Sequence, residues 1–327
     1  MDALSDVLRA VRLSGAFFFD VQASDPWVAE TPRGESIVEA MFPGSEHLIS
    51  YHLIVSGSAW VRVAGEPDML LGAGDIVVLP HGDTHVLSST PGLRRAPEMT
   101  MYRRPEDGQL PVTIAMGGSD NSPGTRFVCG FLGCDARPYN PLLSALPRIF
   151  CLNDHVSGAL GAYFTFALAE ASNSRLGRAG VLNRISELMF VDAVRRYLEG
   201  LPTERSNWLA GLRDPFVGRA LAAMHRDPAR EWTLPSLASE AALSRSALVE
   251  RFTQFVGRPP MQYLADWRMQ LAANHLRTTT DSVLAVAHRV GYQSEAAFSR
   301  AFKKAVGSPP GEWRAASRQS PGARSGA

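Results

Sequence analysis

Cysteine, lysine and long apolar runs are all scarce in this chain of 327 residues. Three cysteines are too few for a disulfide framework in a chain of this length, which favours a reduced, cytoplasmic protein. The longest apolar stretch, residues 158–169, is too short to span a bilayer. The first residues lack the basic region of a secretion signal. With 45% apolar and 20% charged residues the composition is globular, and the length predicts two domains.

Positive charge is concentrated towards the C-terminus. Residues 213–327 hold 16 Lys/Arg against 9 Asp/Glu, whereas residues 1–212 hold 17 against 23. A basic third joined to an acidic body indicates that one part of the chain meets a polyanion such as nucleic acid. The alternative is a basic surface without a partner.

The first two thirds of the chain contain three kinds of pattern. Apolar residues at helical spacing predict a short opening helix at 3–13. From about residue 15 to 134, short apolar runs alternate with Gly- and Pro-containing turns, which predicts a β-sandwich or barrel. Residues 140–200 then carry two apolar helical stripes. These stripes are expected either to pack on the barrel or to form a dimer interface.

The C-terminal third contains an internal repeat with an offset of 50 residues. Matching pairs are Ser244/Ser294, Leu248/Phe298, Phe252/Phe302, Val256/Val306 and Gly257/Gly307. Each copy predicts a helix-turn-helix: a short helix starting at Thr233 or Asp281, a tight turn, and a longer helix starting at Ser244 or Ser294. Residues 261–276 predict a connecting helix of about 24 Å, able to hold two recognition helices about one DNA turn apart.

The second helix of a helix-turn-helix enters the major groove N-terminal end first, so its residues outside the apolar stripe are candidate DNA contacts. These are Arg245, Ser246, Val249 and Glu250 in the first copy, and Glu295, Ala296, Ser299 and Arg300 in the second. Lys303 and Lys304, the only lysines, follow the second helix and suit phosphate contacts. Arg268 on the connecting helix is a further candidate. The alternative for these residues is a solvated helix face.

Residues 213–314 resemble the DNA-binding domain of AraC/XylS-family transcription regulators. The resemblance rests on Trp232-Thr-Leu-Pro-Ser-Leu-Ala, Leu243-Ser-Arg-Ser-Ala-Leu, Trp267-Arg-Met-Gln-Leu-Ala and Val290-Gly-Tyr-Gln-Ser-Glu-Ala-Ala-Phe-Ser-Arg-Ala-Phe-Lys-Lys. It implies seven helices, two helix-turn-helix units and σ-dependent promoter control, with RNA polymerase as a partner. It also places Arg300 where family members commonly have a base- or phosphate-contacting arginine. Glu250 stands at the equivalent place in the first copy. Its expected role is to accept a hydrogen bond from a cytosine amine or to orient a neighbouring arginine.

The segment Gly74-Asp-Ile-Val-Val-Leu-Pro-His-Gly-Asp-Thr-His85 resembles the second cupin motif, and implies a cupin-type sensor domain. His52, His81, His85 and Cys129 supply imidazole and thiolate groups suited to Zn, Fe or Ni. The alternative is a set of hydrogen-bonded histidines in a ligand pocket or on the surface. The His-x-His pair and the Glu of cupin enzymes are missing, so only His85 is carried over cleanly from the family motif.

Cys129, Cys134 and Cys151 are candidates for a redox or electrophile sensor, the alternative being inert buried thiols. Cys129 and Cys134 are five residues apart on a predicted strand and should point to opposite faces. A bulge at Gly130 or Gly133 would bring them together.

These patterns predict an α+β multidomain protein that acts as a sequence-specific transcription regulator and not as an enzyme. The expected parts are a cupin-like effector-sensing domain (1–139), a helical dimerisation segment (140–205), an AraC-type DNA-binding domain (213–314) and a disordered tail (315–327). Expected partners are double-stranded promoter DNA, RNA polymerase, a small-molecule effector and a second copy of the chain, with no membrane. The alternatives are a metal-dependent cupin enzyme with an appended DNA-binding domain, and an architectural protein without operator preference.

Overall fold

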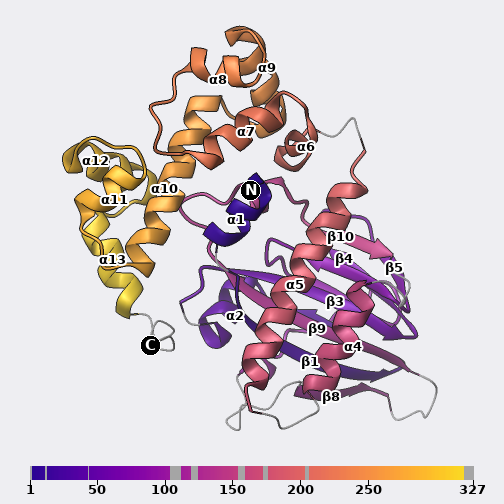
Figure 1. Cartoon of the computed structure of the whole chain (residues 1–327). Helices are drawn as coiled ribbons and strands as arrows, with labels where there is room; N and C mark the ends of the chain where they lie inside the picture. Colours follow the sequence, from indigo (N-terminus) through magenta and orange to yellow (C-terminus); the bar gives the residue numbers. More distant parts are fainter. Residues whose placement is uncertain are drawn as a thin grey trace. The chain divides into compact units, whose positions relative to one another are not determined.

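The computed structural model describes residues 2–11, 13–42, 44–103, 112–118, 124–153, 159–171, 176–202 and 206–319 (Figure 1). The backbone divides into two compact units that interleave along the chain. Unit 1 comprises Met1–Arg12, Asp135–Ala145 and Gly200–Ala327, and unit 2 comprises Leu13–Cys134 and Leu146–Glu199. The boundary that the sequence analysis places after residue 139 thus falls within a segment of unit 1, and the opening helix also belongs to unit 1.

Unit 2 contains two β-sheets. The larger sheet has the strand order β10-β6-β3-β9-β1-β8 and the smaller one the order β2-β7-β4-β5. The strands are β1 (Ser14–Ser24), β2 (Val28–Thr31), β3 (His47–Ser56), β4 (Ser58–Val63), β5 (Met69–Gly72), β6 (Asp75–Leu79), β7 (His85–Ser88), β8 (Val112–Gly117), β9 (Thr125–Cys134) and β10 (Phe150–Asn153). A helix α2 (Gly34–Met41) and a 3₁₀ turn η1 (Met99–Met101) connect them. This architecture confirms the predicted sheet-rich N-terminal region.

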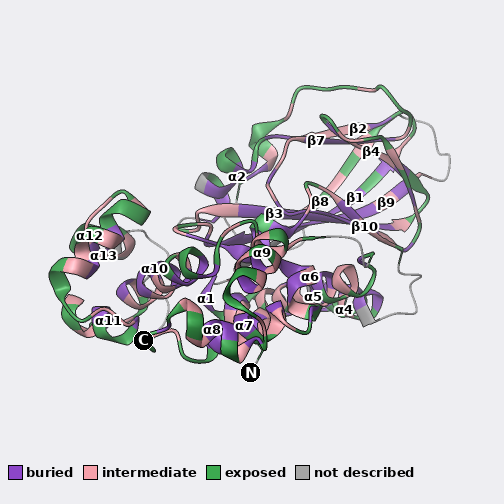
Figure 2. Cartoon of the chain, turned by 90° about the horizontal axis from the view of Figure 1, so that it is seen from above, coloured by how far each residue is buried: buried purple, intermediate pink, exposed green. Residues whose placement is uncertain are grey.

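The core of unit 2 fills the space between the two sheets. On β4, the buried residues Ala59, Val61 and Val63 alternate with more exposed neighbours, as expected for a strand with one face on a core. The core cluster draws side chains from both sheets and from α2, and Trp27 stacks on Phe127 at a centroid distance of 5.0 Å. Figure 2 shows this buried interior in purple, with exposed loops in green around it.

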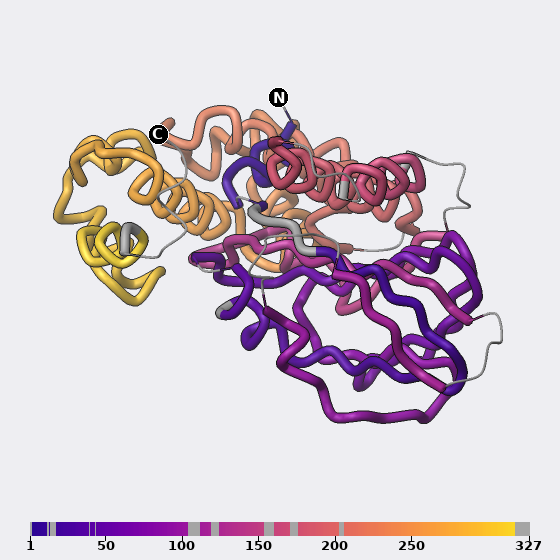
Figure 3. The backbone as a smooth tube through the Cα atoms, turned by 90° about the horizontal axis from the view of Figure 1, so that it is seen from below, coloured from indigo at the N-terminus to yellow at the C-terminus, as the bar shows by residue number. Residues whose placement is uncertain are grey.

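Two helices, α4 (Ala159–Ala171) and α5 (Arg178–Glu199), cover one face of the six-stranded sheet (Figures 1 and 3). Phe164 of α4 lies 5.9 Å from Tyr51 of β3, and Tyr197 of α5 lies 4.7 Å from Phe150 of β10, measured between ring centroids. Their apolar stripes therefore pack on the sheet. The expectation that residues 140–200 are helical was wrong at β10, because a four-residue strand is too short to show a period of its own.

Unit 1 is helical. It contains α1 (Ala3–Ala10), α3 (Pro141–Ala145), α6 (Trp208–Arg213), α7 (Val217–Arg226), α8 (Leu234–Glu240), α9 (Arg245–Val256), α10 (Pro260–Thr278), α11 (Val283–Arg289), α12 (Glu295–Val306) and α13 (Pro310–Gln319). Because α13 continues to Gln319, the predicted disorder from residue 315 was wrong for 315–319, and residues 320–327 lie outside the described residues. Among the helices that the structure describes, none has the length and apolarity needed to cross a membrane.

Capping residues at the starts and ends of the helices set the limits of the two helix-turn-helix motifs. The side chains of Thr233, Ser244 and Ser294 accept from backbone N–H groups at the starts of α8, α9 and α12, as predicted. The prediction that Asp281 caps α11 was wrong, because the hydroxyl of Ser282 accepts from the backbone N–H of Ala285 at 3.1 Å. Helices α9 and α12 both end at a left-handed glycine, Gly257 or Gly307, which allows the chain to leave the helix sharply.

Candidate nucleic-acid interface and sensor core

Helices α9 and α12 present equivalent surfaces. Each has 12 residues and follows a capping serine, and each buries two side chains completely at its fourth and eighth positions. Those buried residues are Leu248 and Phe252 in α9, and Phe298 and Phe302 in α12. The candidate DNA contacts lie outside this buried stripe, at the first, second, fifth and sixth positions of each helix. Each helix therefore offers one outward face near its N-terminal end.

The outward faces are exposed, as Figure 2 shows in green. Exposed residues are Arg245, Ser246 and Glu250 on α9, and Glu295, Ala296, Arg300, Lys303 and Lys304 on α12; Val249 and Ser299 are half-buried. Both lysines lie in the last turn of α12 itself, where a positive charge interacts favourably with the helix dipole. The surface is thus positive at Arg245 and at Arg300, Lys303 and Lys304 of α12, and is negative at Glu250 and at Glu295, the first residue of α12.

Arg268 occupies a different position from the other candidates. It lies half-buried on α10, and its guanidinium donates to the carbonyls of Pro228 at 2.7 Å and Arg230 at 2.8 Å. Desolvation lowers the pKa of this arginine from its ordinary value. These bonds fix the loop that precedes α8, so Arg268 positions the first helix-turn-helix from within.

Helix α10 carries the two helix-turn-helix units at its two ends (Figure 1). It has 19 residues and a length of about 28 Å at 1.5 Å per residue. Helices α11 and α12 share one apolar core with its C-terminal half, built around Leu276, Phe298 and Trp313. The connecting helix predicted from residues 261–276 is therefore a packed helix that contacts both helix-turn-helix motifs.

Segments from the N-terminal half of the chain are bonded to α10 within unit 1. The completely buried Gln270 accepts from the backbone N–H of Tyr139 at 3.1 Å and donates to the carbonyl of Ala10 at 3.4 Å. Arg277 pairs with the buried Asp135 at 2.8 Å. Asp135 directly follows Cys134, the last residue of β9. These residues were missed by the sequence analysis, because no local pattern links positions more than 100 residues apart.

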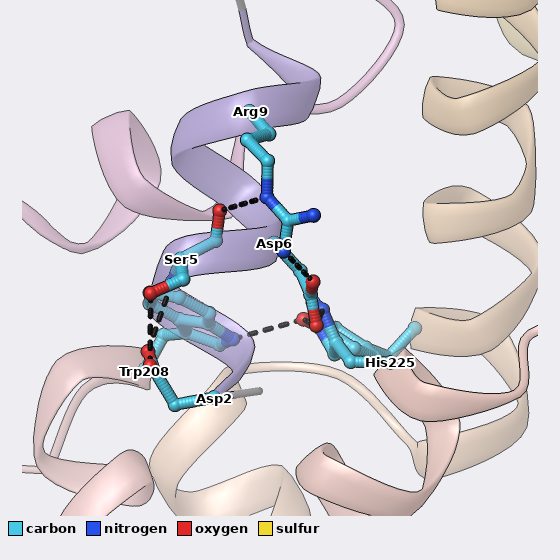
Figure 4. Close-up of polar contacts among 7 residues, drawn as sticks. Asp2, Ser5, Asp6, Arg9, Trp208 and His225 are labelled. Carbon is cyan, nitrogen blue, oxygen red and sulfur yellow. Dashed lines mark hydrogen bonds and ion pairs between the residues drawn. The ribbon is translucent and has the colours of Figure 1, made fainter.

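A second polar cluster joins α1 to α7 and α10 (Figure 4). The indole N–H of Trp208 donates to the hydroxyl of Tyr263 at 3.0 Å, and that hydroxyl lies 2.7 Å from His225 Nε2. The hydroxyl proton finds an acceptor if it is donated to Nε2, which leaves the proton of His225 on Nδ1, 4.0 Å from the carboxylate of Asp6. Burial lowers the pKa of His225 to about 3, so the ring is neutral at physiological pH.

Inside unit 2, three of the four candidate metal ligands form a chain of hydrogen bonds. His52 Nδ1 lies 2.8 Å from Cys129 Sγ, and His52 Nε2 lies 2.7 Å from His85 Nε2. His85 Nδ1 lies 2.8 Å from the carbonyl of Asp83. The pairing of β3 with β9 sets His52 opposite Cys129, while β7 supplies His85.

The direction of the chain follows from its last acceptor. A carbonyl can only accept, so His85 carries its proton on Nδ1 and accepts at Nε2. His52 then donates from Nε2 and accepts at Nδ1 from the thiol of Cys129. Every buried group has one partner for each proton, which suits neutral rings. Burial lowers the pKa of His85 to about 4 and places that of His52 well below its ordinary value.

His81 does not join this group. Its Nε2 lies 3.0 Å from the carbonyl of Leu146, and its ring faces His47 at a centroid distance of 6.5 Å. Within the described parts of the chain, no cluster of three or more His, Cys, Asp or Glu side chains has the arrangement of a metal site. Both ring nitrogens of His52 and of His85 already have hydrogen-bond partners, so these residues do not fit a cupin metal centre.

Cys129 and Cys151 are placed as protonated thiols rather than as reactive thiolates. Burial raises the pKa of Cys129 well above its ordinary value and that of Cys151 to about 11. Reactivity toward oxidants and electrophiles follows the thiolate form. Cys129 belongs to the core between the sheets, and Cys134, also buried, lies outside that core cluster.

Comparisons with known proteins agree with both halves of the structure. Residues 2–199 match the family described as Cupin, and residues 237–316 match the family described as a helix-turn-helix domain. An AraC-like transcription regulator of Streptomyces lividans is 32% identical over 319 residues, which cover 96% of this chain and 98% of the relative. The chain belongs to the AraC family of transcription regulators. A second family member, AlkR of Acinetobacter baylyi, is 28% identical over 320 residues, or 96% of this chain and 99% of AlkR.

Among solved structures, the DNA-binding domain of AdpA in complex with a target DNA is 32% identical; the match covers 32% of this chain and 94% of that one, with a TM-score of 0.31. As an AraC-family member, the protein is a DNA-binding transcription regulator with an N-terminal ligand-sensing, cupin-like domain, and the enzyme alternative is not favoured.

Proposed function

We propose that this AraC-family regulator recognises a specific operator by inserting α9 and α12 into successive stretches of the major groove. The observation that carries this proposal is the equivalence of the two helices: same length, same serine cap and the same exposed positions. A rod of about 28 Å between them suits recognition sites about one DNA turn apart.

Within this proposal the candidate contacts have different roles. Arg300 contacts a base or a phosphate, and Arg245 does so from α9. Lys303 and Lys304 neutralise phosphates, since a lysine acts as a compact point charge. Glu250 accepts from a cytosine amine or orients an arginine. Arg268 acts indirectly, because its donors are bonded to Pro228 and Arg230.

We further propose that the regulator is a homodimer that pairs through the outer face of α4 and α5. Phe166 on α4 is 56% exposed and Leu188 on α5 is 44% exposed, although both helices already bury their inner stripes on the sheet. Among residues 159–171 the one charged side chain is Glu170, which is buried. The outer side of α4 is therefore apolar and carries no exposed charge, although α5 beside it exposes Arg184. A second copy of the chain would cover such an apolar surface best.

In this proposal the dimer works in the cytoplasm, where it recruits RNA polymerase to the promoter and responds to a small-molecule effector. The compact units divide the chain differently from the domain limits proposed from the sequence. Residues 1–12 and 135–145 belong to the unit that contains the DNA-binding helices, and residues 146–199 belong to the unit that contains the sheets. Catalysis is not part of the proposed function, because the relatives that match most of the chain are described as transcription regulators.

The deciding experiment is a titration of the full chain against duplexes covering its own upstream region, at several salt concentrations. Preference for one duplex by about a thousand-fold over unrelated DNA is expected, with a strong salt dependence. Equal, weak affinity for every duplex would instead indicate an architectural protein.

A further inference from the structure

The two helix-turn-helix motifs contact each other directly, in addition to their shared attachment to α10. The loop at 227–232 leads into α8, the first helix of the first motif, and the turn at 291–293 leads into α12, the recognition helix of the second. Across this contact the side-chain amide of Gln293 donates to the carboxylate of Glu231 at 3.3 Å. We call the loop, the turn and Arg268 beside them the inter-motif junction.

Gly291 brings the turn and the loop together backbone to backbone. A Cβ added at this position would lie 2.7 Å from the carbonyl oxygen of Ala229 and 3.0 Å from its Cα, so no side chain fits between the two segments. Gly291 also has φ 85°, in the left-handed region that favours glycine. Contact between two backbones fixes their separation more closely than contact between long, flexible side chains would.

Arg268 holds the junction together from α10. Its guanidinium donates to two carbonyls of the loop, those of Pro228 at 2.7 Å and Arg230 at 2.8 Å. The same group also borders the turn, because a Cβ at Gly291 would lie 2.9 Å from Nη2 of Arg268. A guanidinium is planar and presents its donors in a fixed geometry. One rigid group therefore touches the connecting helix and both motifs.

The junction is a second connection between motifs that α10 already joins. The first motif packs on the N-terminal half of α10, where the ring of Phe252 lies 5.6 Å from that of Tyr263. The second motif packs on the C-terminal half, around Leu276 and Phe298. An α-helix can curve along its length, so α10 alone would let the two recognition helices tilt relative to each other. A second contact beside the helix removes this freedom.

We propose that the inter-motif junction fixes the separation of α9 and α12, and that Arg268 is the positioning residue through which the regulator selects operators of one spacing. The proposal rests on the proposed function, because it requires that α9 and α12 both read DNA. Two linked binding modules gain about 10²–10⁴-fold in affinity, and the gain is lost when geometry prevents simultaneous contact. One inserted base pair shifts a groove segment by about 3.4 Å and rotates it by about 35°.

The test compares the preferred operator with a duplex that has one base pair inserted between the two segments that the full chain protects from hydroxyl-radical cleavage. The wild type should bind the uninterrupted operator about a hundred-fold more tightly than the inserted duplex. Arg268→Met keeps a straight side chain that suits a helix but removes both donors, and should lower this ratio about ten-fold. The lost positive charge weakens binding to both duplexes alike, so the ratio reports spacing alone.

Arg219→Met is the matched control. Arg219 is an exposed arginine of α7 whose guanidinium donates to the carbonyl of Pro215, and its replacement should leave the ratio as in the wild type. Gly291→Ala acts on the other side of the junction by forcing the turn away from the loop, and should also lower the ratio. Circular dichroism checks that each variant folds, and Gly291→Ala decides the outcome if Arg268→Met does not.

Three results would overturn the proposal. The first is a wild type that prefers its operator but binds the inserted duplex equally well. The second is a folded Arg268→Met protein, or Gly291→Ala in its place, that keeps the wild-type ratio. The third is an Arg219→Met protein that loses as much discrimination as Arg268→Met. A wild type that prefers no duplex at all refutes the proposed function instead, which separates the two failures.

Discussion

Asp135 and Arg277 form an ion pair in which both side chains are buried, with 1% and 8% of their surface exposed. Asp135 is the residue that follows the last strand-forming residue of β9, and Arg277 lies on the helix that carries both helix-turn-helix units. Within unit 1, the segment that contains Asp135 is therefore held against α10 by a buried charge pair.

Replacing Asp135 by Ala should destabilise the protein by about 3–5 kcal/mol, because the guanidinium of Arg277 is left buried without its counter-charge. Urea unfolding of the full chain measures the loss. Asp68→Ala is the control, since the pair of Asp68 with Arg62 lies at the surface and contributes little. An Asp135→Ala protein as stable as the control would show that this pair holds nothing in place.

Arg300→Ala should lower the affinity for the preferred operator by about 1–3 kcal/mol if the guanidinium contacts a base. Lys303→Ala should weaken binding to all duplexes alike, and should reduce by about one the slope of log affinity against log salt concentration. Arg219→Ala is the matched control, an exposed arginine on α7 whose guanidinium donates to the carbonyl of Pro215. Fluorescence anisotropy at several salt concentrations measures all three, and an Arg300→Ala variant that matches Arg219→Ala would remove Arg300 from the contact set.

Removing a methyl group from the turn of the first helix-turn-helix motif should raise the stability of the fold, whereas adding one to the turn of the second should lower it. Ala242 has φ 54° after α8, and Gly291 has φ 85° at the corresponding place after α11. A left-handed conformation costs a residue with a Cβ about 1–2 kcal/mol, so Ala242→Gly should stabilise the protein by about 1 kcal/mol.

Gly291→Ala should destabilise by more than the conformational cost, because its Cβ would lie 2.7 Å from the carbonyl oxygen of Ala229 and 2.9 Å from Arg268. Thermal unfolding of both variants gives the comparison. A destabilised Ala242→Gly protein would mean that the Ala242 methyl group makes a contact worth more than the backbone strain.

Acid should weaken the fold through the sensor core. His52 and His85 have lower pKa values in the folded chain than in the unfolded chain, so the unfolded chain binds more protons between pH 6.5 and about 4. Their contribution is complete above pH 6.5 and is lost as the pH falls, by about 1.4 kcal/mol per pH unit for each ring.

His85→Gln should reduce this pH dependence of the free energy of unfolding by about 1 kcal/mol between pH 6.5 and 5.5, measured by urea unfolding at each pH. The same substitution at the exposed His288 is the control. A slope that His85→Gln leaves unchanged would contradict a neutral, buried His85.

Phe166→Glu should convert a homodimer into a monomer, because a carboxylate cannot be buried in an apolar interface without a partner. Leu70→Glu on β5 is the matched control, since Leu70 and Phe166 are each 56% exposed. Sedimentation velocity distinguishes the two species. If both variants sediment as the wild type does, the face of α4 and α5 is not where two copies meet.

The sequence predicts the DNA-binding part well, since its signals are local. Serine caps, apolar residues at i, i+4 and i+8, and glycines after the helices all act within a few residues. The start of α11 was mispredicted by one residue. Asp281 and Ser282 are adjacent and have similar N-cap preferences, so the sequence did not distinguish them, and Ser282 is the residue that caps the helix.

What the sequence could not predict depends on pairs distant along the chain. His52 meets Cys129 through the register of β3 and β9. A surface pocket of unit 2 is likewise lined by Arg33, His81 and Arg148, which come from separate segments of the chain. Composition and spacing hold no information on strand order, so His52, His81 and His85 appeared as one candidate group, although His81 lies apart from the other two.

The bonds of Gln270 and Arg277 have a practical consequence for dissecting this regulator. A fragment starting at residue 206 would lack Ala10, Asp135 and Tyr139, and would leave the Gln270 amide and the Arg277 guanidinium on α10 without these partners. Such a piece should precipitate or bind DNA poorly for reasons unrelated to recognition. Splicing residues 2–11 and 135–145 back onto it, through short flexible tethers, is the way to obtain a well-behaved half-molecule.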